Sequence, residues 1–226
     1  ALTEGINVTM EDIWAIHKIG SDLWLRENTN IYCYDFQSIK QYSFQDKVSC
    51  SAVTGQKLLI FVNNHGVFSL EDDGHFTALP GTESLKEKRV VSIIPYEENI
   101  VFVCSNGEIY LYDDKQMSIF NNSFKKETEQ ATIYCADSNG RYLALGTVTD
   151  GVFILDLSTG RKMHLNTYSG LQNNTVLSMF FDLEGNLWLG LDKGIDLILL
   201  SSSVYSLFGN SDAFGTGYAS EIYDGR

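Results

Sequence analysis

The stretch GLQNNTVLSMFFDLEGNLWLGLDKGIDLIL, residues 170–199, consists of three short apolar segments separated by turn residues. The segments 176–181, 187–189 and 195–200 are rich in residues that favour strands. The connections at 182–186 and 192–194 carry Asp, Glu, Gly and Asn, which are typical of tight turns. A sheet of this size has too little surface to form a core alone, so further copies are expected along the chain.

Copies of this unit recur at regular intervals. Segments 21–35, 56–70, 98–113, 140–157 and 185–199 each hold an apolar strand, a polar turn and a second apolar strand. The centres of the first of these strands fall at Trp24, Ile60, Phe102, Ala144 and Trp188, a period of about 40 residues. Each copy is preceded by another apolar strand and followed by a weaker amphipathic one, the last of them at 204–208. One repeat is therefore predicted to be four short antiparallel strands, the pattern of a β-propeller blade.

The predicted fold class is all-β: a β-propeller of about five complete four-stranded antiparallel blades plus a partial sixth. Neighbouring blades would cover both faces of the middle strands, which explains why those strands are continuously apolar. The whole chain, 1–226, is expected to be a single partial propeller domain and a fragment of a longer propeller array. The predicted blades are 6–45, 46–88, 89–130, 131–172 and 173–212, with the partial sixth blade at 213–226.

Composition limits the function classes. The 226 residues carry a formal net charge of −13, so the chain repels phosphate backbones and no nucleic-acid partner is expected. No apolar run reaches the roughly 18 residues of a membrane span, and the first residues lack the basic and apolar parts of a signal peptide. The four cysteines are expected to be small buried hydrophobes and not a zinc site, while their spacing leaves disulfides open. They are Cys33, Cys50, Cys104 and Cys135.

No catalytic motif is present. The sequence lacks GxSxG, HExxH and a P-loop, and its four histidines are spread along the chain at positions 17, 65, 75 and 164. We therefore predict no catalytic residue, no metal site and no cofactor. Asp182, Glu184 and Asn186 lack the further oxygen ligands of a calcium loop, so a β-turn is expected there. The paired carboxylates of a glycosidase cannot be recognised from sequence, because their pairing is spatial.

The loops between the second and third strands of each blade are the candidate ligand-binding region. In a propeller they gather on one face together with the connections between blades, and here they are rich in Asn, Asp, Thr and His. The candidate ligand-binding residues on them are Arg26, Asn63, His65, Asn106, Asp150, Asp192 and Lys193. Trp14 is added as a residue of an innermost strand that would face the central channel. Trp24 and Trp188, in middle strands, are expected to pack between blades.

The segment 170–195 resembles the two-component regulator propeller repeat. That repeat has a Gly-Leu start, an Asp-x-x-Gly-Asn turn, a Leu-Trp-x-Gly strand and a second turn that ends in glycine. The matching residues are Gly170, Leu171, Val176, Asp182, Gly185, Asn186, Leu187, Trp188, Gly190 and Gly194. The segment 22–25, with Trp24, resembles it more weakly. The repeat period of this family extends over the whole chain, whereas its motif residues are matched in one blade.

The resemblance implies a periplasmic, extracytoplasmic sensor region of a hybrid two-component receptor, with an oligosaccharide or related glycan as ligand. The implied partners are adjacent propeller blades, downstream receptor domains and a second copy in a homodimer. Kinase and receiver motifs are absent from this chain, so it is expected not to be an enzyme itself. Two alternatives stay open: a non-catalytic protein-interaction scaffold, although the Gly-His and Trp-Asp signatures of WD repeats are missing, and a propeller-type glycan hydrolase or lyase.

Overall fold

The computed structural model describes residues 10–120, 124–129 and 131–200, and its regular structure is almost entirely β. Blade 1 contains β1 (Ala15–Ile19), β2 (Asp22–Arg26), β3 (Asn30–Tyr34) and β4 (Ile39–Ser43). Blade 2 contains β5 (Val48–Thr54), β6 (Lys57–Val62), β7 (Gly66–Leu70) and β8 (Phe76–Ala78). Blade 3 contains β9 (Val90–Tyr96), β10 (Asn99–Cys104), β11 (Ile109–Tyr112) and β12 (Met117–Ile119).

The second half of the chain continues the same arrangement. Blade 4 contains β13 (Ile133–Ser138), β14 (Tyr142–Thr147), β15 (Val152–Asp156) and β16 (Lys162–Leu165). Blade 5 contains β17 (Val176–Phe181), β18 (Leu187–Leu191) and β19 (Ile195–Ile198). Two short 3-10 turns, η1 (Glu83–Leu85) and η2 (Thr167–Ser169), lie between blades. Every sheet is an antiparallel meander in chain order, so the all-β propeller prediction is confirmed.

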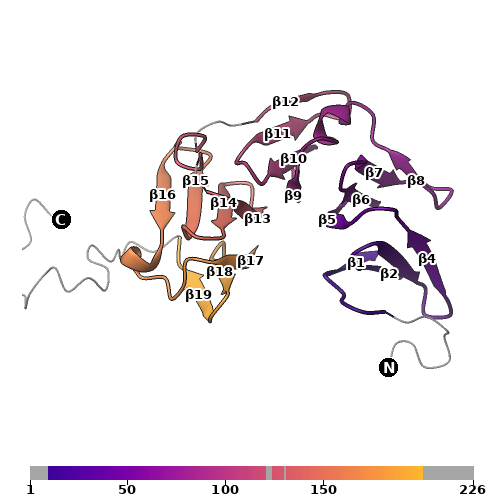
Figure 1. The fold of residues 1–226 in the computed structure, drawn as a ribbon, viewed down its shortest axis with the longest axis horizontal. Helices are drawn as coiled ribbons and strands as arrows, with labels where there is room; N and C mark the ends of the chain where they lie inside the picture. The colour runs from indigo at the N-terminus through magenta and orange to yellow at the C-terminus, as the bar shows by residue number, and fades with distance from the viewer. Residues whose placement is uncertain (1–9, 121–123, 130, 201–226) are drawn as a thin grey trace, which may run out of the picture.

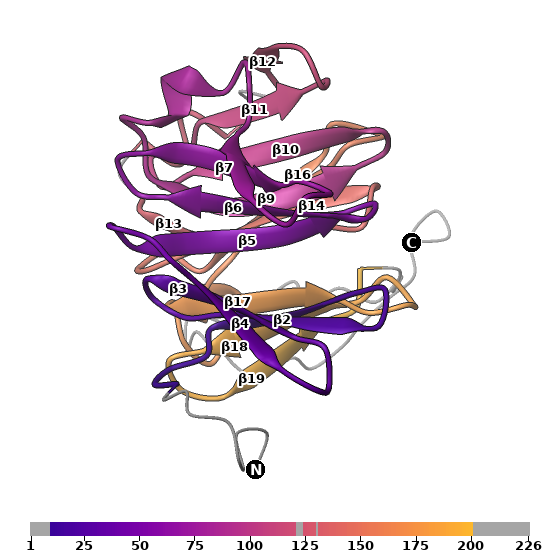
Figure 2. The same ribbon diagram turned by 90° about the vertical axis from the view of Figure 1, so that its right-hand side faces the viewer.

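The five blades form an arc, with β1, β5, β9, β13 and β17 on its inner edge and β4, β8, β12, β16 and β19 on its outer edge (Figure 1). Seen from the side, the sheets of blades 1 and 5 lie at one end of the molecule and the other three lie beyond them (Figure 2). Blades 1 and 5 are the two ends of the arc. The predicted fourth strand of blade 5 at 204–208 and the partial sixth blade at 213–226 lie outside the described residues, and the blade boundaries stay a prediction.

The cores lie between blades. Trp24 and Ile31 of blade 1 pack with Leu58, Ile60 and Val62 of blade 2. Corresponding clusters join blades 2 and 3, blades 3 and 4, and blades 4 and 5. In blades 2, 3 and 4 each face of the middle strand is thus removed from water by a different neighbour, as the continuous apolar runs predicted.

Strand register fixes which residues are equivalent. In every blade one residue of the second strand pairs with an equivalent residue of the inner strand. The pairs are Arg26 with Ala15, Phe61 with Cys50, Val103 with Ser92, Gly146 with Cys135 and Gly190 with Ser178. The residues two positions earlier are Trp24, Leu59, Val101, Ala144 and Trp188. The centres expected at Ile60 and Phe102 were therefore one residue late, because turn lengths differ between blades. A one-residue shift matters, since it moves a side chain to the opposite face of the sheet.

The packing prediction is confirmed for Trp24 and stays a prediction for Trp188, because the expected following blade, 213–226, lies outside the described residues. Trp24 is only 6% exposed, between blades 1 and 2. Trp188 is 42% exposed, because blade 5 has no following blade among the described residues.

The cysteines are buried or half-buried. All four cysteines are free; Cys50 and Cys104 are buried, while Cys33 and Cys135 are half-buried. Burial raises the pKa of the Cys50 thiol to about 12. The described part of the chain has no cluster of His, Cys, Asp or Glu suited to a metal ion, and none of its helices is long and apolar enough to cross a membrane.

Candidate functional site: the loop face around residues 124–131

The turns that join the second and third strands lie on one face of the arc, against the connections between blades. Main-chain hydrogen bonds hold them there. The amide of Asn63 donates to Lys47 O at 2.9 Å and that of Ser105 to Arg89 O at 2.8 Å. The amides of Val148 and Asp192 donate in the same way to Thr132 O and Thr175 O. We call this surface the loop face.

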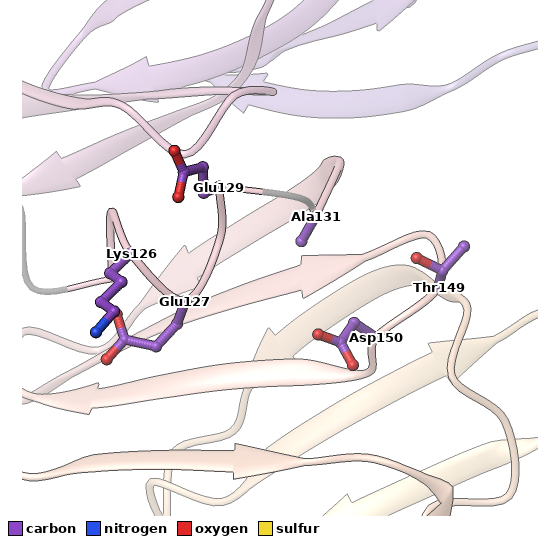
Figure 3. A pocket seen from close by; sticks show the side chains of 6 residues that line it. All are labelled: Lys126, Glu127, Glu129, Ala131, Thr149 and Asp150. Atoms are coloured by element: carbon purple, nitrogen blue, oxygen red, sulfur yellow. The ribbon is translucent and has the colours of Figure 1, made fainter.

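Two adjoining hollows open on the loop face beside residues 124–129 and 131. The first, of about 410 Å³, is lined by Lys126, Glu127, Glu129, Ala131, Thr149 and Asp150, whose side chains surround it in Figure 3. The second, of about 500 Å³, is lined by Asn106, Glu108, Lys125, Lys126, Glu127, Glu129 and Lys162. The predicted site residues Asn106 and Asp150, which lie in different blades, thus line two hollows that share Lys126, Glu127 and Glu129.

A buried anchor positions this loop. The ring of Phe124 is buried, 5.7 Å from that of Phe153 in β15. Thr128 is also buried; its amide and its hydroxyl both donate to Phe124 O at 2.8 Å. Gly107 has φ of 81° and lies against the Thr128 side chain, so a Cβ at this position would collide with it. The Asn106–Gly107 turn and the 124–131 loop are therefore fitted to each other.

Ion pairs order the charged side chains around the second hollow. Lys88 Nζ lies 2.7 Å from Glu108 Oε2, and this hydrogen bond lowers the pKa of the Glu108 carboxyl and raises that of Lys88. Lys162 Nζ lies 2.8 Å from Glu127 Oε1 and lowers the pKa of Glu127. The hollows therefore present fixed carboxylates beside ammonium groups, together with the Asn106 amide. Such a set donates and accepts hydrogen bonds with a polar ligand.

The first hollow is bordered by an ordered histidine. His164 Nε2 lies 2.6 Å from Asp150 O and 3.5 Å from Asp150 Oδ1. Its ring stacks on Phe153 with a centroid separation of 4.2 Å. Stacking and hydrogen bonding hold His164, and with it the Asp150 turn, in place.

The other predicted site residues do not line these hollows. His65 Nε2 contacts Asp46 Oδ2 at 3.0 Å, and Asn63 Oδ1 is buried without a hydrogen-bond partner in the part of the chain that the structure describes. Asp192 and Lys193 are exposed on the β18–β19 turn. Trp14 is 55% exposed just before β1, with Lys47 Nζ 5.7 Å from its ring centroid.

Arg26 contacts the neighbouring blade, and its assignment to ligand binding stays a prediction. Its Nη1 donates to Val48 O at 2.8 Å and Ser49 O at 3.1 Å, and its Nε donates to Ser51 Oγ at 3.0 Å. These acceptors belong to blade 2, so the guanidinium joins the two blades.

Sequence reasoning missed the residues of the 124–131 loop. The signal was present, because the connection between β12 and β13 is long and contains an isolated aromatic, Phe124, among charged residues. In a polar loop such an aromatic indicates an anchor to the core.

Comparisons with known proteins agree with this architecture. No protein-family model matches the chain. Over 198 residues it is 22% identical to "Histidine kinase P4" of Formosa agariphila, an alignment that covers 81% of this chain and 14% of the kinase.

Three solved structures extend the comparison. The chain is similar to the extracellular domain of BT4673 from B. thetaiotaomicron, described both as a one-component and as a hybrid two-component system, with a TM-score of 0.65, 23% identity, and coverage of 85% of this chain and 28% of that one. The extracellular domain assigned to the hybrid two-component system BT3049 of the same organism has a TM-score of 0.65 and 16% identity. This match covers 88% of this chain and 30% of that one. The β-propeller domain of Cps50 (Swd1) from Myceliophteria thermophila has a TM-score of 0.61 and 12% identity, and the match covers 87% of this chain and 68% of that one. These similarities show the propeller fold, and the chain spans less than a third of the two extracellular domains.

Proposed function

We propose that this chain is part of the extracytoplasmic, periplasmic sensor region of a two-component receptor. The observation that carries the proposal is the common blade arrangement with the extracellular domains of BT4673 and BT3049, at a TM-score of 0.65 for each. The alignment with a histidine kinase supports it independently, because that comparison rests on sequence. In this role the propeller binds and transmits, and catalysis belongs to another domain.

The proposed ligand is a glycan that binds on the loop face at the two hollows. Sugar hydroxyls both donate and accept, and the hollows offer amide, carboxylate and ammonium groups within one small area. Signalling then requires that the glycan favour one arrangement of the receptor over another, since a ligand of equal affinity for both shifts nothing.

Titration calorimetry with a panel of neutral, uronic-acid and sulfated oligosaccharides tests the proposal. We expect at least one member to bind, and we expect Asn106→Ala and Asp150→Ala each to weaken that binding at least tenfold. Asp73→Ala, an exposed change in the β7–β8 turn outside both hollows, is the matched control and is expected to bind normally. Failure of every oligosaccharide to bind, or unchanged affinity in both site variants, would overturn the glycan proposal.

A further inference from the structure

A groove of about 570 Å³ lies between blades 2 and 3. It is lined by the β5–β6 and β9–β10 turns, at the strand ends remote from the loop face. Strand register supplies its two walls. In blade 2, Leu59 of β6 pairs with Ser69 of β7. In blade 3, Ile100 of β10 pairs with Pro95 of β9 and with Tyr112 of β11, so these walls are mainly apolar.

Contacts between the blades bound the groove. Tyr112 Oη donates to Pro80 O at 2.9 Å. Gly81 has φ of 78°, and a Cβ at this position would lie 2.6 Å from Lys115 O. The connection between blades 2 and 3 is thus packed against the β11–β12 turn beside the groove, so the space is part of a well-packed junction.

Ser69 is an unusual residue at its position. The equivalent residues in the third strands of the other blades are Cys33, Leu111, Ile154 and Leu197. A serine is smaller than leucine or isoleucine and leaves space in the wall. Ser69 is only 2% exposed, and its Oγ has no hydrogen-bond partner among the described residues. A buried hydroxyl in this condition is unfavourable unless a ligand bonds to it.

The nearby carboxylate of Glu71 does not satisfy this hydroxyl. Thr77 Oγ1 donates to Glu71 Oε1 at 2.9 Å, and Lys57 Nζ donates to Oε2 at 3.2 Å. Thr77 and then Lys57 lower the pKa of the Glu71 carboxyl most, and Ser69 contributes least, as expected for a hydroxyl that lies near but outside hydrogen-bonding distance. Ser69 Oγ can therefore still donate and accept.

The mouth of the groove is acidic. Glu97, Glu98 and Asp114 are exposed there, and none of the three has a hydrogen bond or an ion pair within the described part of the chain. Glu97 has φ of 51°. The left-handed residue of the same turn in the other blades is glycine, at Gly20, Gly55, Gly140 and Gly185. A carboxylate thus stands at the mouth where the backbone itself favours glycine.

We propose that this groove is a second ligand site and that it takes a linear aliphatic amine with two or more ammonium groups. The methylene segments match the apolar walls, while the ammonium groups match the carboxylates and can donate to Ser69 Oγ. An anion is disfavoured, because four carboxylates line the groove and Lys57 is the single cation among its lining residues. The described residues hold no cluster suited to a metal ion, which favours an organic cation.

This site is independent of the glycan proposal, because no residue of the groove lines either hollow of the loop face. Titration calorimetry of the full chain with cadaverine and with spermidine tests it. A pentanediol of the same length and glutarate are the neutral and anionic counterparts. We expect both amines to bind and neither counterpart to do so.

Ser69→Leu introduces the side chain that blade 3 has at this position, Leu111, and should lower the affinity for both amines at least tenfold by filling the groove. This variant leaves the net charge unchanged, so it separates the groove from a general attraction of cations to an acidic chain. Glu97→Gln should weaken binding at least threefold. Glu87→Gln, an exposed carboxylate outside the groove, is its matched control and should bind normally.

Thermal unfolding without amine shows whether the variants fold. We expect Ser69→Leu and Ser69→Ala to be at least as stable as wild type, because each removes an unsatisfied buried hydroxyl. Ser69→Ala adds no bulk, so it reports the hydroxyl alone and should weaken amine binding at least threefold. Undiminished binding in both Ser69 variants, or failure of both amines to bind the wild-type chain, would overturn the proposal and leave the glycan proposal untouched.

Discussion

Trp24 and Trp188 occupy the same position in blades 1 and 5 and are held by different interactions. Trp24 is buried, stacked on Tyr42 at 5.7 Å and edge-on to Phe76 of the next blade at 6.4 Å. Trp188 is half-exposed, and its indole Nε1 donates to Asp182 Oδ2 at 2.9 Å. The comparison teaches that burial of the motif tryptophan comes from the following blade, whereas its orientation can be fixed within its own blade.

The residue two positions later extends the contrast. Arg26 in blade 1 reaches across to three acceptors in blade 2. Gly190 in blade 5 has the same register and has no side chain that could reach a neighbouring blade. One position therefore either forms a polar bridge or carries no side chain.

The largest expected effect is that of truncating the buried tryptophan. Trp24→Ala should lower the free energy of unfolding by about 3–5 kcal/mol, the usual cost of removing a large aromatic from a core. Trp188→Ala should cost about 1–2 kcal/mol, from one hydrogen bond and partial burial. Urea unfolding of both variants measures the difference. Equal losses would contradict the contrast between the two blades.

The bridge between blades 1 and 2 gives the next effect. Arg26→Ala should cost about 1.5–3 kcal/mol, the range for hydrogen bonds made by a charged group. Arg26→Lys keeps the charge but not the planar set of donors, so its cost should be intermediate. Urea unfolding measures both. If Arg26→Ala were as stable as wild type, the guanidinium would not join the blades.

Sequence could predict those features that depend on a strand and its immediate turns. The strands, the period and the Asp182 turn follow from apolar runs and turn residues, and those that fall within the described residues are present in the structure. Features that depend on a neighbouring blade were missed. The contacts of Arg26 with carbonyls of blade 2 were not predicted because those partners are far away in sequence, and the motif does not reveal whether a following blade covers Trp188.

The candidate site was predictable to the same extent. Asn106 and Asp150 could be placed on the loop face from their turns, but the hollows depend on how the 124–131 loop folds back. This loop conformation requires Phe124 to pack on Phe153 and Thr128 to pack on Gly107. No local sequence pattern indicates these contacts.

A smaller effect is expected where Trp188 is fixed to its own turn. Asp182 accepts hydrogen bonds from Trp188 Nε1 and from the amides of Glu184 and Asn186, and these bonds lower the pKa of its carboxyl. Because the folded-state pKa lies below the ordinary value of 3.8, this stabilisation is present above pH 3.8 and is lost as the pH falls through the folded-state pKa.

Asp182→Asn should therefore be less stable than wild type at neutral pH, and the gap should close in acid. Thermal unfolding between neutral and acidic pH measures the gap, and Asp192→Asn on the next turn is the matched control. A gap that is constant over that range would show that the carboxylate charge has no part in holding Trp188.

The smallest effect concerns the cross-strand partners of the two tryptophans, His17 in blade 1 and Phe180 in blade 5. His17 Nε2 lies 2.8 Å from Ser51 Oγ, and burial, followed by the nearby Arg26 charge, lowers its pKa below 6.5. As the pH falls through 6.5 the unfolded chain takes up the proton first, so stability is complete above that value and decreases below it.

His17→Phe reproduces the blade 5 pairing and should flatten the dependence of unfolding free energy on pH just below 6.5. Urea unfolding at a series of pH values measures the slope, with His75→Phe, an exposed histidine in blade 2, as the matched control. A slope equal to that of wild type in His17→Phe would mean that His17 binds its proton equally well in the folded and unfolded chain. The polar contact with Ser51 would then have no pH-dependent part in joining blades 1 and 2.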